Sequence, residues 1–275
     1  MQQGRRKYPR LAAAVLHLSA CKAYNPRSLK IPRPQGPNGR KRLQMFLTEN
    51  KYPVHRFWWM WAPLILLVAV AIINPFLGKE HGSPWMYAEN GILETLQWLI
   101  ALGAAGLGFA CLRLCKGRPW LALWVALGML GSLYIGLEEI SYGQHIFKWE
   151  TPEHWQALND QGETNLHNTS AWLDQKPRLL VFIGVIVGGL ILPFVRRLRP
   201  AALPARFNAI YPPDALFWTA LCAVLAHAAK WAKKLGIAEI YNRASEMNEV
   251  FIYYFVFLYL LFMLMSLRAA KKGAV

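Results

Sequence analysis

Acidic residues are scarce in this chain, and several familiar functional motifs are missing. Only 15 Asp and Glu stand against 31 Lys and Arg, so the 275 residues carry a formal net charge of +16. The sequence has no Walker loop, no Gly-x-Ser-x-Gly elbow and no His-Glu-x-x-His pair. These absences exclude a P-loop nucleotide site, an α/β-hydrolase nucleophile and a zincin-type zinc site.

Long polar stretches are also rare, because the apolar residues, 55% of the chain, gather into six runs. A helix of about 20 apolar residues spans the hydrocarbon layer and satisfies its own backbone polar groups there. The runs therefore predict an all-α fold, a polytopic membrane bundle of about six helices within a single domain, 45–275. The approximate helix bounds are 57–77, 91–114, 120–137, 179–195, 215–229 and 250–267.

Basic residues mark one side of this predicted bundle. They cluster before the first run, after the second, after the fourth and in the tail. These segments can all be cytoplasmic together, as the positive-inside rule requires, whereas 13 of the 15 acidic residues lie on or beside the opposite links. We therefore expect cytoplasmic termini and an outward-facing segment 138–178. In a soluble protein this net charge would indicate nucleic-acid binding, but its distribution here favours membrane topology and no nucleic-acid partner.

The first 44 residues form a basic arm rich in Pro, Gly and Arg, without a periodic apolar face. That composition predicts a disordered cytoplasmic segment. Such an arm can lie against anionic headgroups, where each basic residue contributes about 1 kcal/mol. An alternative interpretation is that translation starts at Met45.

Cysteine is rare as well, with four residues in the chain. Cys111 and Cys115 are one helical turn apart near the predicted cytoplasmic end of the second helix, and Cys222 lies inside the fifth. None of these three lies in an outward-facing segment, so the sequence predicts no disulfide framework. We expect them to be packing residues.

The outward side carries the polar residues that point to a function. Glu94 lies about one turn into the second predicted helix, and Glu138 and Glu139 end the third. Carboxylates at membrane depth are costly and usually face the interior of a bundle. A continuation of the third helix through residue 143 would align one polar stripe: Glu138, Ser141, Tyr142 and His145.

The segment 138–178 is long enough to fold back over the helix ends as a lid. Thr151 is a good N-cap and precedes a proline, which predicts a short helix over 152–158 with Trp155 and Leu158 at the lipid boundary. Arg243, near the start of the sixth helix, is spaced to pair with Glu239 or Glu246.

We expect these polar residues to converge in one outward-opening cavity. The candidate catalytic residues are Glu139, Glu163, His167 and Glu138. The supporting polar cluster comprises Glu94, Tyr142, Asn165, Asn168, Arg243, Glu246 and Glu249. Carboxylates that lie close together can divide the roles of acid and base, and Glu with His can hold a divalent metal ion. The cofactor is left open, and the candidate metal ligands are Glu139, Glu163 and His167.

Five short motifs carry a resemblance to known proteins: "ENGILE", "EEISYGQ", "ETPE", "QGETNLHN" and "SEMNE". Their order across residues 57–267 resembles that in a group of bacterial multi-pass membrane proteins with no established activity. The resemblance implies a bacterial inner-membrane location.

Three functions fit this pattern. The first is an outward-facing hydrolase or group transferase acting on a lipid or lipid-linked substrate. The second is a non-catalytic partner that docks another membrane or envelope protein through Trp149, Trp155 and Trp172. The third is a proton- or cation-coupled transporter, which ranks last because the inner half of the bundle has few acidic residues to complete a pathway.

Overall fold

A computed structural model describes residues 52–76, 86, 91–158, 164–166, 169 and 171–272. These residues belong to one compact unit, Asn38–Val275. The basic arm 1–44 lies outside the described residues, so its predicted disorder stays a prediction. Helices and turns make up the described part of the chain, and no strand occurs within it.

Within that part, six helical spans are long and apolar enough to cross a membrane. Their bounds are Phe57–Phe76, Ile92–Leu112, Pro119–Glu138, Lys176–Leu198, Asp214–Lys234 and Ala244–Lys271. The predicted polytopic helix bundle is therefore confirmed. The largest difference is at the sixth helix, which begins at Ala244 and not near residue 250, because its polar first turns pack against other helices.

The elements follow one another as listed here. The first three spans comprise the π-helical turn η2 (Phe57–Trp61) with α2 (Ala62–Ile73) and η3 (Asn74–Phe76), then α3 (Ile92–Leu112) and α4 (Pro119–Glu138). The short elements η4 (Ser141–Gly143), α5 (Gln144–Phe147) and α6 (Glu153–Gln156) come next. The fourth span comprises α7 (Ala171–Val185), the π-helical η6 (Ile186–Ile191) and α8 (Leu192–Leu198). After η7 (Pro200–Ala202) and η8 (Ala205–Phe207) come η9 (Asp214–Leu216), α9 (Phe217–Lys234) and α10 (Ala244–Lys272).

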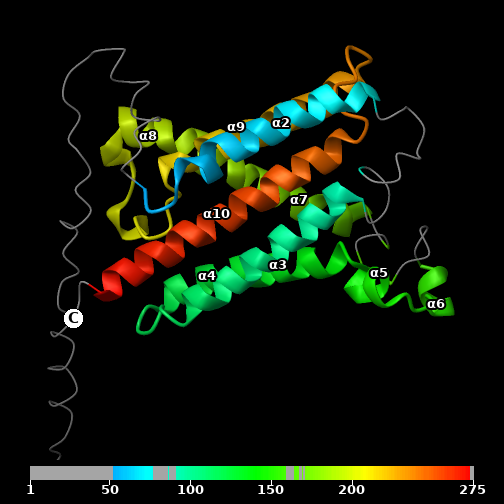
Figure 1. Ribbon diagram of the computed structural model, residues 1–275. Helices are drawn as coiled ribbons and strands as arrows, with labels where there is room; N and C mark the ends of the chain where they lie inside the picture. Colours follow the sequence, from blue (N-terminus) through cyan, green and yellow to red (C-terminus); the bar gives the residue numbers. More distant parts are fainter. Residues whose placement is uncertain are drawn as a thin grey trace, which may run out of the picture. The chain divides into compact units, whose positions relative to one another are not determined.

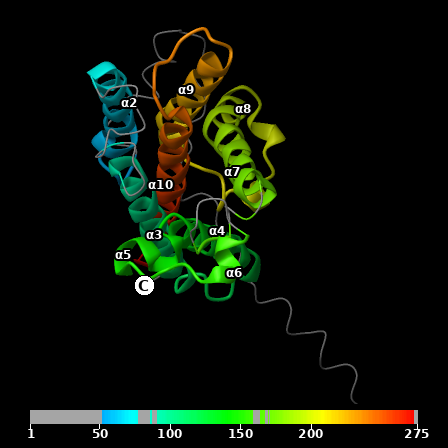
Figure 2. The same cartoon turned by 90° about the vertical axis from the view of Figure 1, so that its right-hand side faces the viewer.

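The last helix, α10, is the central one. It contacts α3, α4, α7 and α9, and it crosses the middle of the bundle in Figures 1 and 2. In its most apolar stretch of 18 residues, 61% is buried inside the protein, compared with 22–44% in the same stretch of the other five spans. Polar side chains on α10 therefore meet other helices more than lipid.

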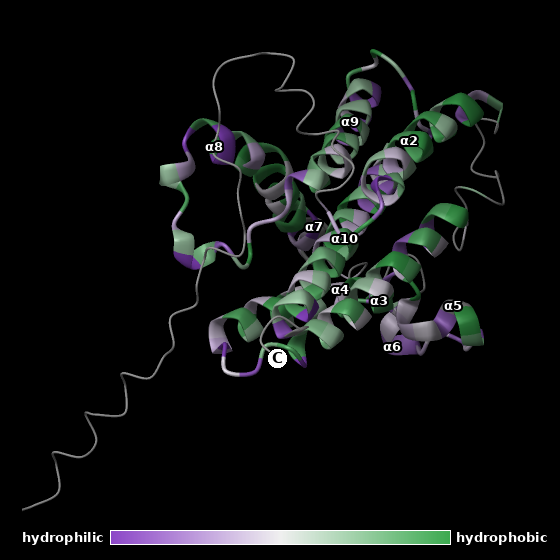
Figure 3. Cartoon of the chain, turned by 60° about the vertical axis from the view of Figure 1, so that its left-hand side comes forward, coloured by the Kyte–Doolittle hydropathy of each residue, from purple (hydrophilic) through white to green (hydrophobic). Residues whose placement is uncertain are grey.

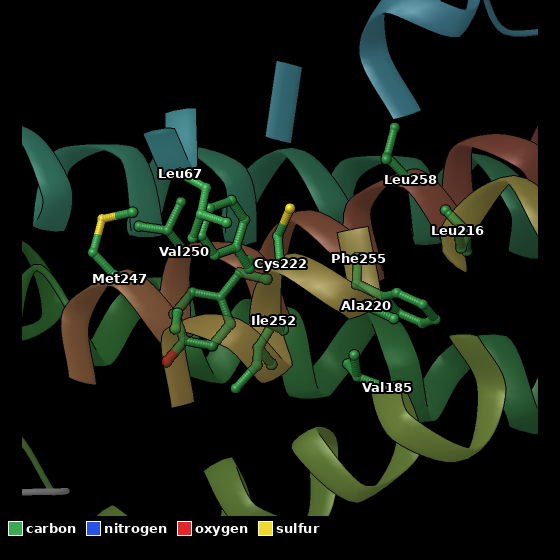
Figure 4. Close-up of a cluster of buried hydrophobic side chains, with 14 of the residues drawn as sticks. Leu67, Val185, Leu216, Ala220, Cys222, Met247, Val250, Ile252, Phe255 and Leu258 are labelled. Carbon is green, nitrogen blue, oxygen red and sulfur yellow. The ribbon is translucent and has the colours of Figure 1, made fainter. Parts of the chain in front are cut away.

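The main hydrophobic core joins α10 to α2, α7 and α9. Figure 4 shows Val250 and Phe255 of α10 in one cluster with Leu67 of α2 and Ala220 of α9. The fourth span approaches this core closely at Gly189, where a Cβ atom would lie 2.3 Å from Cβ of Ala220. Only glycine permits that approach of two membrane helices.

The three cysteines among the described residues are buried and free. Cys222 belongs to the main core, and Cys111 and Cys115 belong to a second cluster where α3, α4 and α10 meet. Their burial agrees with the packing role that the sequence predicts.

A proline in the first span leaves one backbone carbonyl available for a hydrogen bond from the central helix. In η2 the backbone N–H of Ala62 donates to the carbonyl of Phe57, which is the π-helical register. The next donor in this register would be Pro63, which has no N–H. The carbonyl of Trp58 instead accepts a hydrogen bond of 2.7 Å from the Tyr254 hydroxyl of α10.

Successive spans run in opposite directions, so the bundle has two chemically different ends. We call the end where α4 finishes and where α3 and α10 begin the acidic end. We call the opposite end, where α3 and α8 finish, the basic end. The acidic end carries Glu94, Glu138, Glu139, Glu246 and Glu249, and the basic end carries Arg113, Arg118, Arg196, Arg197 and Arg199. Figure 3 shows the apolar residues along the helices between these ends.

Candidate functional site

The third span does not continue as the sequence analysis expects. Helix α4 ends at Glu138, and the chain turns with positive φ at three successive residues, 45° at Ser141, 55° at Tyr142 and 106° at Gly143. The left-handed region costs a non-glycine residue about 1–3 kcal/mol and is concentrated at functional sites. The predicted stripe on a helix continuing through residue 143 is therefore wrong. The turn buries Ser141 completely and leaves Tyr142 40% exposed, and the side chain of His145 lies outside the described part.

Glu138 is buried beneath this turn and has strong hydrogen-bond donors. The Tyr142 hydroxyl donates to its Oε1 at 2.5 Å, and the backbone N–H of Leu166 donates to its Oε2 at 2.8 Å. Partial burial raises the pKa of Tyr142 above its ordinary value of 10, and the hydrogen bond to Glu138 raises it further. Tyr142 is therefore a protonated donor at neutral pH, and Glu138 holds the turn to the segment that contains Leu166.

Further hydrogen bonds join the turn to the same segment. The Asn165 side chain, fully buried, donates to Oγ of Ser141 at 3.1 Å, and the backbone N–H of Thr164 donates to Oε1 of Gln144 at 2.7 Å. Gln144 in turn donates to Oγ1 of Thr151 at 2.6 Å. We call residues 138–151 and 164–166 the polar cap. It agrees with the fold-back that the sequence analysis predicts for 138–178.

The short helix within this segment is smaller than predicted. It covers Glu153–Gln156 instead of 152–158, and Pro152 occupies the N-cap position. The Thr151 hydroxyl, predicted to cap this helix, instead accepts the hydrogen bond from Gln144. The carbonyl of Thr151 accepts a hydrogen bond of 2.8 Å from the Gln156 side chain.

A second polar group lies inside the bundle around Tyr253 of α10, which is 3% exposed. Its hydroxyl donates to Oε1 of Glu139, the residue that follows α4, at 3.3 Å. The charged side chains that act on this hydroxyl are those of Glu139, Glu249, Arg178 and Glu246. With a rise of 1.5 Å per residue, Tyr253 lies roughly 13 Å along α10 from its first residue. The hydrogen bond to Glu139 therefore joins α10 to the end of α4, more than two turns after α10 begins.

Glu249 and Arg178 form the most buried ion pair of this group. The guanidinium of Arg178 donates to Oε1 of Glu249 at 2.9 Å and joins α7 to α10. The side chains are 30% and 5% exposed, respectively. A carboxylate as buried as that of Glu249 depends on such a partner, because an unpaired charge in this position is strongly destabilising.

Arg243 pairs across the bundle as well. Its guanidinium lies 3.4 Å from Oε1 of Glu94 on α3. The sequence spacing pointed to local partners, Glu239 or Glu246, and did not reveal this contact between two spans. Glu239 itself lies 2.5 Å from Nζ of Lys233 on α9.

Gln97 on α3 was missed by the sequence analysis. It is fully buried, and its Nε2 donates to Oε2 of Glu246 at 2.9 Å and to the Glu246 carbonyl at 3.1 Å. Its Oε1 has no hydrogen-bond partner among the described residues. One signal could have found it, because Gln97 lies one helical turn after Glu94 in an otherwise apolar stretch.

The candidate residues fall into three sets. Glu139 contacts Tyr253 of α10, the helix that also carries Glu246 and Glu249. Glu138 belongs to the polar cap with Tyr142 and Asn165, and Glu94 pairs with Arg243. Glu163, His167 and Asn168 lie outside the described residues, so their convergence with the others stays a prediction. Among the residues that the structure describes, no group of three His, Cys, Asp or Glu is placed to hold a metal ion.

The fold and the site define a multi-pass membrane protein with a buried polar group at one end. No protein-family model, curated protein or solved structure matches the chain. The resemblance to bacterial membrane proteins therefore rests on the five sequence motifs alone.

Proposed function

We propose that this chain is an enzyme of a bacterial inner membrane, a hydrolase or group transferase that acts on a lipid or lipid-linked substrate. Its acidic end would face outward and its termini would be cytoplasmic. The charge distribution supports this orientation, because arginine and lysine gather at the basic end. The motif resemblance supports the bacterial origin.

Glu139 is the proposed general base. Glu138 and Glu249 are almost fully buried, at 3% and 4% exposure, and accept bonds from strong donors. Glu139 is only half-buried, and it stands where α4 leaves the membrane. A general base must reach the proton that it removes, so among the described carboxylates next to Tyr253 the one at the helix end suits this role best.

The surrounding residues support such chemistry. Glu139 would take the proton of a water or hydroxyl nucleophile while that oxygen forms a bond to an acyl or phosphoryl centre. The bond from this centre to the leaving alcohol oxygen would then break, and the protonated Glu139 would return its proton to that oxygen. The Tyr253 hydroxyl would orient the carboxylate. Arg178 and Arg243, which are 30% and 43% exposed at their side chains, would supply positive charge for a phosphate group. The strained turn after Glu139 would hold both glutamates in a constant position.

The test is Glu139→Gln, with the exposed Glu153→Gln on α6 as the matched control. Lipid extracts of cells that produce each protein would be compared by mass spectrometry with extracts of cells lacking it. We expect a changed lipid species with the wild type and Glu153→Gln, and its loss with Glu139→Gln at unchanged protein level. A wild type that changes no lipid would contradict the enzyme. A protein captured by the wild type and lost in Glu139→Gln would favour the partner function instead.

The proposed orientation has its own test. Reporter fusions after residues 115 and 200 should give a cytoplasmic signal, and fusions after residues 160 and 240 an outer one. A cytoplasmic signal at 160 would place the acidic end inside and contradict an outward-facing site.

A second candidate, cation-coupled transport, is favoured by Gln97. Its Oε1 is a buried acceptor with no partner among the described residues, and Nε2 of the same amide contacts the carboxylate of Glu246. A buried acceptor of this kind suits a cation or a hydrogen-bond donor. Sodium chloride should then raise the melting temperature of the wild type above its value in choline chloride, and Gln97→Leu should remove the difference. Equal melting temperatures of the wild type in both salts would contradict this candidate.

A further inference from the structure

The polar cap exposes large apolar side chains at α5 and just beyond it. Ile146 is 54% exposed, Phe147 74% and Trp149 40%. The rings of Phe147 and Trp149 are stacked, with centroids 6.0 Å apart and planes at 11°. Figure 1 shows α5 beside the bundle at the acidic end. A run of exposed apolar side chains marks a surface that contacts another apolar phase.

The backbone keeps these side chains in place. Lys148 ends α5 with φ of 59°, and Gly143 precedes it with φ of 106°. A Cβ atom on Gly143 would lie 3.2 Å from the rings of both Phe147 and Trp149, so the two rings pack over this glycine. The Gln144 side chain donates to the carbonyl of Trp149 at 3.2 Å. The exposure of the rings therefore belongs to a hydrogen-bonded structure and not to a loose loop.

The position of α5 in the fold indicates what covers these side chains. It begins shortly after α4 ends at Glu138, at the level where a membrane span leaves the hydrocarbon layer. The lipid-facing side of α4 is apolar, with Leu127 60% and Leu130 55% exposed. Aromatic side chains, tryptophan above all, are enriched at this level of membrane proteins.

The charged residues near these rings also fit a location at the membrane interface. Lys148 lies between Phe147 and Trp149 in the sequence and is exposed. A lysine beside inserted aromatic side chains can extend its ammonium group to the lipid phosphates. The exposed acidic residues Glu150 and Glu153 follow in the sequence, where the chain would return to water.

We infer that residues 146–149 form an interfacial anchor that lies in the lipid headgroup layer. Ile146, Phe147 and Trp149 insert at the boundary with the acyl chains, and Lys148 meets the phosphates. The anchor holds the turn that covers Glu138 at a constant depth in the membrane. It does not depend on the proposed enzyme activity, because it follows from exposure, backbone geometry and position alone.

The test measures where the Phe147 position lies in vesicles. A spin label would be attached to Phe147→Cys of the full chain, in a Cys21→Ser background, since the other three cysteines are buried. Reference labels would be Leu130→Cys on the lipid-facing part of α4 and Glu153→Cys on α6. Oxygen, which concentrates in lipid, and a water-soluble nickel chelate would be the collision partners.

We expect the Phe147→Cys label to favour oxygen, as the Leu130→Cys label does, and the Glu153→Cys label to favour the chelate. A Phe147→Cys label that collides mainly with the chelate would overturn the anchor. A label shielded from both agents would show that protein covers this surface, which would also overturn it. Phe147 is 74% exposed, and the side-chain hydrogen bonds of the cap are made by other residues.

Discussion

The two ends of the bundle hold their charged side chains in different ways. At the basic end, Arg196 pairs with Asp214, 18 residues away, and also donates to the carbonyl of Pro212 at 2.9 Å. At the acidic end, the polar contacts of α10 with α7, α4 and α3 join residues separated by 71, 114 and 149 positions. The first contact fastens a turn between consecutive spans. The others exist only after the whole bundle has assembled.

This difference shows which polar residues depend on the tertiary structure. A carboxylate with a nearby partner along the chain can keep it while the bundle loosens, whereas Glu249 would lose Arg178 as soon as α7 separates from α10. Breaking the buried Arg178–Glu249 pair should therefore destabilise the bundle more than breaking an exposed local pair such as Lys233–Glu239.

The largest expected effect follows from breaking the buried pair. Arg178→Leu leaves the Glu249 carboxylate, 5% exposed, without its cation and should lower the free energy of unfolding by about 3–5 kcal/mol. Thermal unfolding of the purified protein in detergent would measure it. Adding Glu249→Leu should restore much of the loss, because the unpaired charge is removed.

Lys233→Leu is the matched control for this experiment. It breaks the Lys233–Glu239 pair, whose side chains are 44% and 40% exposed, and the exposed hydrogen bond of 2.7 Å from Lys233 to the Asn242 carbonyl. Stability should change little, because water screens the pair and can replace the hydrogen bond. Similar melting temperatures for Arg178→Leu and Lys233→Leu would show that the buried contact has no special role.

A steric test probes the close approach in the fourth span. In Gly189→Ala the new methyl group would overlap Ala220 and the Phe255 ring, which lies 2.7 Å from the ideal Cβ position. We expect a loss of about 1–3 kcal/mol from overpacking. Gly184→Ala in the same span is the control, because no atom lies within 4 Å of its added Cβ. Equal melting temperatures would mean that the helices separate without cost at Gly189.

Gln97→Leu should have a smaller effect on stability. It removes the donor to Glu246, and it also removes the buried Oε1 that has no partner among the described residues. These changes have opposite signs, so the free energy of unfolding in sodium-free buffer should change by about 1 kcal/mol or less. Thermal unfolding in choline chloride would measure it. A loss as large as that of Arg178→Leu would show that Gln97 holds a further partner.

The smallest effect concerns alkaline pH and Tyr142. Because its pKa is raised in the folded protein, first by burial and then by Glu138, Tyr142 keeps its proton above pH 10, where the unfolded chain loses it. Its contribution to stability is fully present below pH 10 and falls as the pH rises further. Denaturant unfolding at pH 7, 9 and 10.5 should show a gap between wild type and Tyr142→Phe that is constant up to pH 9 and then shrinks. A constant gap at pH 10.5 would contradict the raised pKa.

Some features of this protein are determined by the sequence alone. The six spans are local properties, since a run of apolar residues of sufficient length forms a helix that satisfies its own backbone in lipid. The gathering of glutamates at one end follows from the alternating direction of these spans. The boundary of α10 was the least accurate, because Glu246 and Glu249 interrupt the apolar run that hydropathy detects.

Only the tertiary structure decided which polar groups meet. Helical spacing offered Arg243 local partners, but the packing of α10 against α3 brought Glu94 within 3.4 Å of it. Likewise, only the packing of α10 against the end of α4 placed Glu139 against the hydroxyl of Tyr253. The positive φ values at Ser141 and Tyr142 could not be predicted from the sequence either, because neither residue type prefers that backbone conformation. Local periodicity describes one helix at a time, and these contacts join helices whose partners lie 71 to 149 residues apart in the chain.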